Sequence, residues 1–540
     1  MMKRPNIKHN DSLTRSAVWI IFLLCSVSLF AVQRPNIIVF LVDDYDKPET
    51  SVYGGKVLTP NLDRLAREGM VFHNAHVTST VCTPSRYTFL TGRYAGSSHS
   101  ASYLSECPLG QQGLPAFNVG LESDNMNVGQ VLADTGYATG YVGKYHVHDG
   151  PYDDVTIPKN VPYTDALNKQ KYAFEKKHRQ MIMERGFTWA KNIYWGNTKS
   201  PFAGHNPEWT TQAALEFIDT HRDQPFYLHC CSTLLHGPNG SWYKSLVDDP
   251  RMSGEGKLDK PLGLLDRESI LKRIEAAGLT TDEVGYLWMD DCLGLILDKL
   301  DELGIADHTI VLFVSDHGSH KKGSLFKSRG TEIPCLVRWP GVIKPGSENK
   351  TMIQNTDFAP TWFEVAGAKL PKEYIMDGRS LMPTFKDPKR AVREYVYGEQ
   401  GPVRSIKNQE WNYISIRYTK DQAEALNGNR AERAAKTLLG LSGGISRSMA
   451  THPGALGVDQ LYRLDRDPAE QKNLARDPEF AAQLKRMQEN LLDTLEKFPR
   501  RPYGEFIPGT NTTNTDTSES VLGKLRRYAA KDPKKKKPKK

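Results

Sequence analysis

Two apolar runs of the same design constrain the fold more than any other feature of the chain. The segment NIIVFLVDD (36–44) is a continuous apolar run that ends in two acids, and TIVLFVSDHG (309–318) repeats this design. The runs YATGYVGKYH (137–146) and PFYLHCCSTLLH (225–236) are similarly apolar and end in Lys or His. Continuous apolar runs are typical of parallel strands that are buried on both faces. We therefore expect these four segments to be strands in the interior of one sheet.

Segments with helical patterns separate these apolar runs. The segment TPNLDRLAREG (59–69) opens with a Thr-Pro pair and closes with Gly, which are helix start and stop signals. Residues 210–221 and 281–303 also have helical patterns. Because strands alternate with helices, the sequence predicts an α/β fold with a mostly parallel central sheet that helices cover on both faces.

The pattern changes after about residue 385. REYVYGEQ, WNYISIRYT and QLYRLDRDP are short alternating segments with turns between them, as in an antiparallel sheet, and a helix is expected over 478–497. We therefore predict four parts, which are a signal peptide over 1–32, a large N-terminal domain over 33–385, a smaller C-terminal domain of antiparallel sheet plus helix over 386–504, and a disordered lysine-rich tail over 505–540.

The leader has a basic start followed by AVWIIFLLCSVSLFA. This run of about fifteen residues has the length of a signal-peptide core and falls short of the roughly 20 residues that span a bilayer. We expect an exported protein, periplasmic or secreted, with no transmembrane span in the mature chain. A lipid anchor at Cys25 is a weaker alternative, because its flanks lack the small residues that usually precede a lipidated cysteine.

Charge and cysteine spacing argue against two other classes of protein. The net charge of +8 comes from the ends of the chain, since residues 524–540 hold ten Lys or Arg against Asp532 alone. The body between the ends is slightly acidic, so no nucleic-acid partner is expected. The six cysteines beyond the leader show no spacing typical of a disulfide scaffold or a zinc site.

Polar side chains follow each of the four predicted strands. The carboxyl ends of parallel strands meet at one edge of a sheet, where functional groups collect. Three of these side chains are carboxylates, which as hard oxygen ligands suit Ca²⁺ or Mg²⁺. The others are cations or proton donors, which suit an oxyanion substrate. The set consists of Asp43, Asp44, Lys144, His146, His236, Asp316 and His317.

The stretch CTPSR, which begins at Cys82, resembles the C-x-P-S-R signature of sulfatases, and the LTGRY that follows resembles its extension. RPNIIVFLVDD, GYVGKYHV and VSDHG resemble the flanking motifs of that family, in family order. IPCLVRWPG and the late segment QLYRLDRDPAEQKNLA also match. The resemblance covers roughly residues 34–500 and is to the type I sulfatases of the alkaline-phosphatase-like superfamily. It implies that the domain over 33–385 is the catalytic one.

The resemblance implies a specific use for Cys82. In this family a formylglycine-generating enzyme oxidises the signature cysteine to formylglycine during maturation. The hydrated aldehyde attacks sulfur and releases the alcohol, and collapse to the aldehyde then expels sulfate. The implied ligands of one Ca²⁺ ion are Asp43, Asp44, residue 82, Asp316 and His317, and Arg86 would hold the hydrated residue.

The remaining implied roles concern sulfate and its protons. Lys144 would bind sulfate, His146 would act as the base that drives sulfate expulsion, and His236 would bind sulfate or protonate the leaving oxygen. The family's last catalytic lysine is assigned to Lys322, with Lys321 and Lys327 as alternatives, because the local spacing departs from the family pattern.

The function expected from these residues is hydrolysis of sulfate esters by an exported sulfatase, with sulfated carbohydrates as the leading substrate class. Alternatives within the superfamily are an arylsulfatase on small aryl sulfates and a phosphonate or phosphodiester hydrolase. A glycan-binding protein with a decayed site, and an enzyme whose Cys82 stays a thiol, are further alternatives. The sequence leaves open which sugar and position is attacked, endo or exo action, the oligomeric state and the role of the basic tail.

Overall fold

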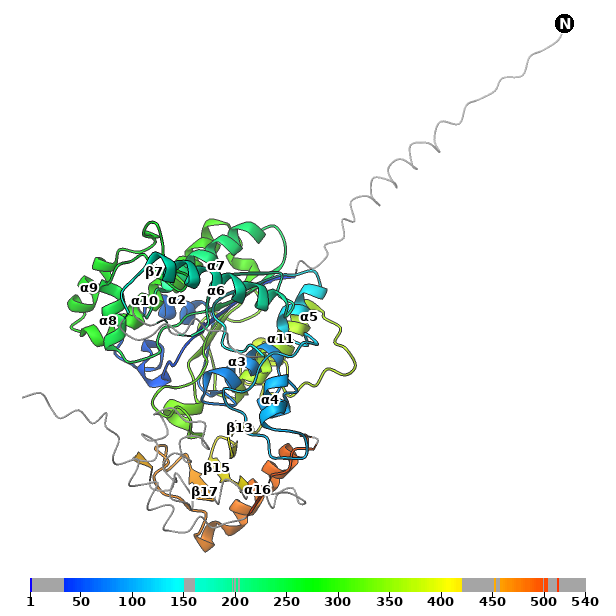
Figure 1. Ribbon diagram of the computed structural model, residues 1–540. Helices are drawn as coiled ribbons and strands as arrows, with labels where there is room; N and C mark the ends of the chain where they lie inside the picture. The colour runs from blue at the N-terminus through cyan, green and yellow to red at the C-terminus, as the bar shows by residue number, and fades with distance from the viewer. Residues whose placement is uncertain are drawn as a thin grey trace, which may run out of the picture.

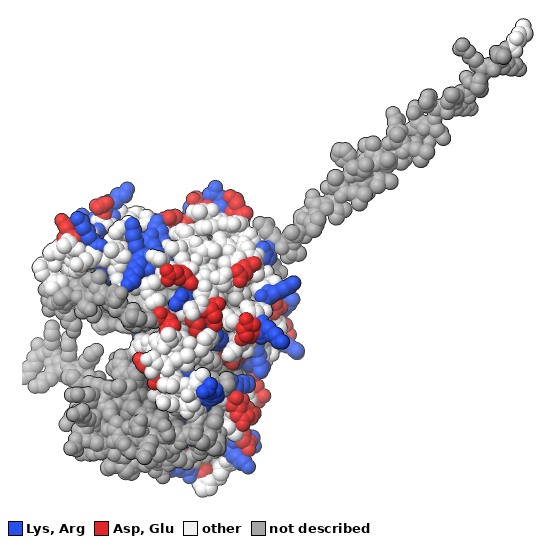
Figure 2. Space-filling view, turned by 45° about the vertical axis from the view of Figure 1, so that its right-hand side comes forward, with Lys and Arg blue, Asp and Glu red and all other residues white. Residues whose placement is uncertain are grey.

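The computed structural model describes Met1 and residues 34–149, 161–196, 198, 201–202, 204–419, 451–452, 457–498, 500–503 and 512–513. The predicted signal peptide and nearly all of the predicted tail lie outside the described residues, so both stay predictions. Within the described part of the chain, no helix combines the length and the apolar character that crossing a bilayer requires. Basic and acidic side chains are interspersed on the face that Figure 2 draws.

An eight-stranded sheet forms the centre of the molecule (Figure 1), in the order β11-β2-β10-β9-β1-β6-β4-β5. Its strands are β1 (Asn36–Val42), β2 (Met70–Phe72), β4 (Ala138–Lys144), β5 (Trp189–Tyr194), β6 (Phe226–Cys231), β9 (Thr309–Ser315), β10 (Cys335–Arg338) and β11 (Ser347–Asn349). Strand β10 runs antiparallel to its neighbours β9 and β2, and the other pairs are parallel. The four apolar runs are the four strands β1, β4, β6 and β9, which confirms that prediction.

Helices cover both faces of this sheet. Side chains of β1 alternate between two cores, so that Ile37 and Val39 pack with α3, α5 and α11, whereas Ile38 and Phe40 pack with α2, α7 and α10. The predicted α/β architecture is therefore confirmed. The bounds of these helices are α2 (Pro60–Glu68), α3 (Cys82–Thr91), α5 (Val128–Asp134), α7 (Pro207–His221), α10 (Val284–Glu302) and α11 (Phe358–Ala366).

Shorter elements complete the large part of the molecule. The helices are α4 (Ala101–Glu106), α6 (Asp165–Met183), α8 (Gly240–Val247), α9 (Arg267–Ala276) and α12 (Met382–Lys386), and the small strand pairs are β3 (Ala75–His76) with β12 (Ile353–Gln354) and β7 (Met252–Ser253) with β8 (Gly256–Lys257). Several of them lie in long connections between the central strands.

A second, four-stranded antiparallel sheet follows in the chain and lies at the bottom of Figure 1. It consists of β13 (Val396–Gln400), β14 (Val403–Lys407), β15 (Trp411–Ile416) and β17 (Asp459–Arg463), and α16 (Ala481–Leu495) packs against β14 and β15. A further short pair joins β16 (Tyr418–Thr419) to β18 (Thr512–Thr513). The antiparallel sheet plus helix was expected, while the domain boundary at residue 385 stays a prediction.

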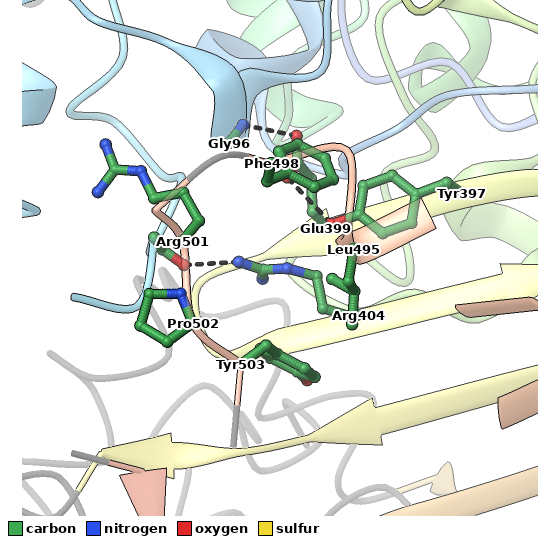
Figure 3. Close-up of a pocket in the computed structure, with 10 residues that line it drawn as sticks. Gly96, Tyr397, Glu399, Arg404, Leu495, Phe498, Arg501, Pro502 and Tyr503 are labelled. Carbon is green, nitrogen blue, oxygen red and sulfur yellow. Dashed lines mark hydrogen bonds between the residues drawn. The ribbon is translucent and has the colours of Figure 1, made fainter. Parts of the chain in front are cut away.

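Buried polar groups join the second sheet to the large part of the molecule. The Glu399 carboxylate accepts a hydrogen bond of 2.9 Å from the Gly96 amide, and the Arg404 guanidinium donates to the Gly113 carbonyl at 2.5 Å. Figure 3 shows the bond between Gly96 and Glu399 at the wall of a small cavity whose lining also includes Phe498 and Tyr503. This cavity lies apart from the polar residues that follow the central strands, since none of them is in its lining.

Candidate active site

The ends of β1 and β9 place three carboxylates together. The two strands are parallel and in register up to the pair Val42 and Ser315, and the Asp316 amide donates to the Val42 carbonyl at 2.9 Å. The Asp44 amide in turn donates to Asp316 Oδ1 at 3.0 Å. Asp43 and Asp316 are fully buried and Asp44 is nearly so. The three acids therefore lie together at this edge of the sheet, as the sequence predicted.

Helix α3 delivers Cys82 to the same edge, because Cys82 is its first residue. The helix is held there by side chains of its own first turns, since the Ser85 hydroxyl donates to the Asp316 carbonyl at 2.5 Å. The Arg86 Nε donates to Asp316 Oδ2 at 3.1 Å, and Nη2 lies 3.2 Å from Asp43 Oδ1. The Arg86 side chain therefore bonds to the carboxylates of Asp43 and Asp316 rather than to the Cys82 side chain.

Four charged groups surround the Cys82 sulfur. Its Sγ lies 3.3 Å from His317 Nε2 and 3.6 Å from Asp43 Oδ1, from Lys144 Nζ and from Lys322 Nζ. Burial would raise the pKa of the Cys82 thiol, but the two lysines lower it to about 6. The site therefore stabilises negative charge at position 82, and the sulfur marks where an oxygen would stand after oxidation of the cysteine.

The predicted calcium ligands satisfy the chemistry of a cation site. Ligand atoms of Asp44, Cys82 and His317 lie within 4.8 Å of one another, and so do those of Asp43, Cys82 and Asp316. Burial raises the pKa of Asp316 to about 7. This reflects the cost of neighbouring carboxylates in a buried place, which a divalent cation among them offsets. Oxygen-rich ligand sets of this kind suit Ca²⁺.

The orientation of His317 fits the same purpose. Its Nδ1 donates to the Gly318 carbonyl at 3.0 Å, which leaves Nε2 facing Asp44 Oδ1 at 3.2 Å. A hydrogen bond from one ring nitrogen to a carbonyl is the usual way in which a metal-binding histidine is oriented. Burial would lower the pKa of His317, but Asp316 and Asp44 raise it to about 9.

Only one of the three lysines considered reaches this centre among the described contacts. Lys322 Nζ contacts Asp44 at 2.9 and 3.0 Å and Cys82 Sγ at 3.6 Å. Lys321 Nζ instead donates to Thr451 Oγ1 at 2.8 Å, and Lys327 Nζ lies 3.7 Å from Glu332. Lys322 is therefore the one of the three whose ammonium group contacts Cys82 in this structure, and its catalytic role stays a prediction.

Lys144 ends β4 and pairs with Asp43 at 2.5 Å. Residues two apart lie on the same face of a strand, so the spacing of Lys144 and His146 in a strand that was predicted to reach residue 146 favours a common face. In the structure, β4 ends at Lys144 and His146 has a left-handed backbone with φ of 54°. The pleat that would impose a common face therefore does not extend to His146. Burial and the nearby Lys144 hold the pKa of His146 well below its ordinary value, and its Nδ1 is buried without a hydrogen-bond partner among the described residues.

His236 and an unpredicted histidine form the outer wall of the site. His236 follows β6, is one-third exposed, and its Nε2 lies 3.8 Å from Asp44 Oδ2. Behind it, His205 is buried and its Nδ1 lies 3.0 Å from Thr233 Oγ1. Burial and the neighbouring His236 lower the pKa of His205 to about 3. Sequence reasoning missed His205 because it stands alone in a loop before α7, where no motif or periodicity marks it.

Comparisons with known proteins point to one family. The family model described as Sulfatase matches residues 35–368, and the model described as N-sulphoglucosamine sulphohydrolase, C-terminal, matches residues 315–424. An ulvan-active sulfatase of Formosa agariphila is 28% identical over 471 residues, which cover 83% of this chain and 77% of that protein. An N-acetylgalactosamine-6-O-sulfatase of Bacteroides thetaiotaomicron is 25% identical over 544 residues, which cover 85% of this chain and 93% of that protein.

Solved structures share the fold. A structure in complex with its substrate D-glucosamine-2-N,6-O-disulfate has a TM-score of 0.56 and 20% identity, and the match covers 87% of this chain and 99% of that chain. The family model spans more than half of the chain and includes the two strand ends, the CTPSR helix and Lys322. The chain therefore belongs to the type I sulfatase family of the alkaline-phosphatase-like superfamily and is a sulfuric ester hydrolase.

Proposed function

We propose that this enzyme removes sulfate esters from sulfated carbohydrates after export from the cytoplasm, with formylglycine at position 82 and one calcium ion. The observation that carries the proposal is the position of Cys82. It begins α3 between the carboxylates of two strand ends and lies 3.6 Å from two lysine ammonium groups. This arrangement combines a reactive residue, a place for a hard cation and two charges that match a sulfate group.

The cation would be held by Asp43, Asp44, residue 82, Asp316 and His317. A bound Ca²⁺ supplies positive charge that polarises a sulfate oxygen. In the present arrangement Lys144 and Lys322 pair with two of these carboxylates. Both ammonium groups also lie 3.6 Å from the Cys82 sulfur, so they would be in reach of an anionic group bound at residue 82.

The chain's own side chains then account for the proton transfers. Formylglycine at position 82 would supply, as its hydrate, one hydroxyl that loses its proton to water and attacks sulfur. Deprotonation of the second hydroxyl would re-form the aldehyde and break the carbon–oxygen bond to the sulfate. His146 stays neutral near pH 7 because its pKa is depressed, and it accepts that second proton. His236 is one-third exposed at the outer wall and donates a proton to the leaving alcohol oxygen. Lys144 and Lys322 neutralise the sulfate oxygens throughout.

Two observations support a carbohydrate as the substrate. Phe117 is 39% exposed, and its ring centroid lies 5.5 Å from that of His146. An exposed aromatic ring beside a reacting group offers a surface on which the apolar face of a sugar ring packs. The two relatives described above act on ulvan and on N-acetylgalactosamine-6-O-sulfate, as their names state. The predicted signal peptide supports export, since polymeric glycans lie outside the cytoplasm.

The proposal is tested by measuring released sulfate with ion chromatography. The enzyme, co-expressed with a formylglycine-generating enzyme, is incubated with ulvan oligosaccharides, glycosaminoglycan disaccharides, nitrophenyl sulfate and nitrophenyl phosphonate esters. We expect the highest kcat/KM on one of the carbohydrates and loss of activity with the chelator EGTA. Faster turnover of the aryl sulfate or the phosphonate ester than of every carbohydrate would contradict the proposed substrate class.

A further inference from the structure

The late segment QLYRLDRDPAEQKNLA contains a buried acid that the proposed chemistry does not use. Glu470 is 1% exposed and has a left-handed backbone with φ of 57°. Its Oε2 accepts a hydrogen bond of 2.7 Å from the Lys327 amide, and its Oε1 accepts one of 2.6 Å from the Asn412 side chain. A buried carboxylate is costly unless its oxygens are satisfied, so its position is tied to these two donors.

One of those donors lies in the loop that carries Lys322. This loop, residues 319–332, is also held by two residues of the second sheet. The Lys407 Nζ donates to Thr331 Oγ1 at 2.7 Å, and the Asn412 Nδ2 donates to the Leu325 carbonyl at 3.2 Å. Glu470, Lys407 and Asn412 therefore form one buried polar cluster, which we call the loop clamp, and it fixes the loop at three points beyond Lys322.

The other face of the loop rests on the chain just before Cys82. The Gly323 amide donates to the Thr80 carbonyl at 3.2 Å, and the Thr80 hydroxyl donates to the Ser324 carbonyl at 2.8 Å. The loop thus lies between the loop clamp and the segment that leads into α3. Lys322 is the residue of this loop whose ammonium group reaches Cys82, so its distance from the reacting residue depends on both supports.

We propose that Glu470 is a positioning residue for Lys322, which it serves through the Lys327 amide and the loop clamp. This inference rests on the proposed role of Lys322 in binding sulfate. It assigns a function to the second sheet, which supplies no residue to the carboxylate centre but sets the geometry of one of its two lysines. Long lysine side chains are flexible, and fixing the backbone beneath one reduces the entropy that it loses on binding an anion.

The test uses inorganic sulfate, the product, as the probe and measures its Kd by titration calorimetry on the mature, calcium-loaded enzyme. Glu470→Gln keeps the shape but puts an amide NH₂ against one of the two donors, so one hydrogen bond is lost. We expect the sulfate Kd to rise by about tenfold, the equivalent of one buried hydrogen bond.

The matched control is Asn473→Ala in the same segment. Among the described residues, Asn473 bonds only within the C-terminal part, to the Leu461 and Ala475 amides and to the Asp459 carbonyl.

A double-mutant cycle with Lys322→Ala separates positioning from general loss of structure. If Glu470 acts through Lys322, Glu470→Gln has no further effect on the sulfate Kd in the Lys322→Ala background, and Asn473→Ala leaves that Kd unchanged while lowering the melting temperature. An equal rise of the Kd in both backgrounds would overturn the positioning role while leaving the proposed function intact. A wild-type sulfate Kd in Lys322→Ala would overturn the assignment of Lys322 and this inference with it.

A second variant covers the case in which Glu470→Gln does not fold. Asn412→Ala removes the bond to the Leu325 carbonyl and one bond to Glu470 without changing the buried charge. The same cycle applies, with a weaker expected effect of about threefold on the sulfate Kd because the Lys327 amide keeps its acceptor. An Asn412→Ala effect that persists unchanged in the Lys322→Ala background would count against the loop clamp.

Discussion

The two aspartates that follow β1 are neighbours in the chain but belong to differently built halves of the site. Asp43 is fully buried and pairs with Lys144 and Arg86, which come from a central strand and from α3. Asp44 lies at the outer side and pairs with Lys322, which comes from a loop. Burial would raise the pKa of Asp43, but its two cationic neighbours hold it well below the ordinary value. In the inner half, a strand and a helix fix the positions of the charged partners of Asp43. In the outer half, the partner of Asp44 lies in a loop, whose position depends on contacts with other parts of the chain.

Residue 82 stands between the two halves, and its loss has the largest expected effect. Cys82→Ala removes the precursor of the nucleophile and is expected to lower kcat by about 10⁴-fold or more. The side chain is small, so we expect the melting temperature to change little. Sulfate release and differential scanning calorimetry measure the two quantities. Wild-type turnover in this variant would remove residue 82 from the mechanism altogether.

The variants Asp43→Asn and Asp44→Asn test whether the two aspartates differ in their contribution to stability. Without calcium, Asp43→Asn leaves two buried cations poorly compensated, and we expect the free energy of unfolding to fall by about 3–5 kcal/mol. Asp44→Asn should cost about 1–2 kcal/mol, because Lys322 retains some access to water. Denaturant unfolding in EGTA measures both free energies of unfolding. We also expect inductively coupled plasma mass spectrometry to find less bound calcium in both variants. Equal destabilisation would remove the distinction between an inner and an outer half.

The outer half is also tested through the leaving group. His236→Ala is expected to lower kcat/KM on a sugar sulfate by about 10²–10⁴-fold, because an alkoxide leaves poorly without a proton. Nitrophenolate leaves readily without one, so hydrolysis of nitrophenyl sulfate should fall much less. The ratio of the two rate losses is the measured quantity. Equal losses on both substrates would mean that His236 binds sulfate and does not act as the proton donor.

The smallest effect is expected from the basic tail. Removal of residues 505–540 should leave kcat/KM on nitrophenyl sulfate unchanged, because every residue proposed for either half of the site precedes residue 505 in the chain. The matched measurement on a polymeric sulfated glycan tests whether the lysines add affinity for a polyanion. A truncated enzyme that fails to turn over nitrophenyl sulfate would show that this segment belongs to the fold.

The contrast between the halves also explains what the sequence could predict. The ends of β1 and β9 were predicted because a continuous apolar run fixes a strand, and the residues that follow it must leave the sheet at its edge. Asp43, Asp44, Asp316 and His317 were found in this way, and the CTPSR motif added Cys82. The α/β fold followed from the same runs and the helices between them.

The parts that escaped prediction lie in loops. Spacing favoured Lys322 and left Lys321 and Lys327 as alternatives, because the contacts that hold this loop come from residues far away in the sequence, such as Asn412 and Glu470. The two-residue spacing of Lys144 and His146 suggested a common face, but the strand ends at Lys144 and the left-handed backbone of His146 breaks the alternation. His205 carries no sequence signal, since it comes to the site through folding of a loop rather than through a motif.

Peptide mass spectrometry of the segment that contains residue 82 tests the central claim most directly. The enzyme is produced with an active formylglycine-generating enzyme, and a known sulfatase serves as the control for oxidation. Our account predicts a mass lower by about 18 Da, since the thiol becomes an aldehyde, together with capture of that aldehyde by a hydrazine probe. An unmodified Cys82 thiol, beside full oxidation of the control, would contradict the proposed nucleophile.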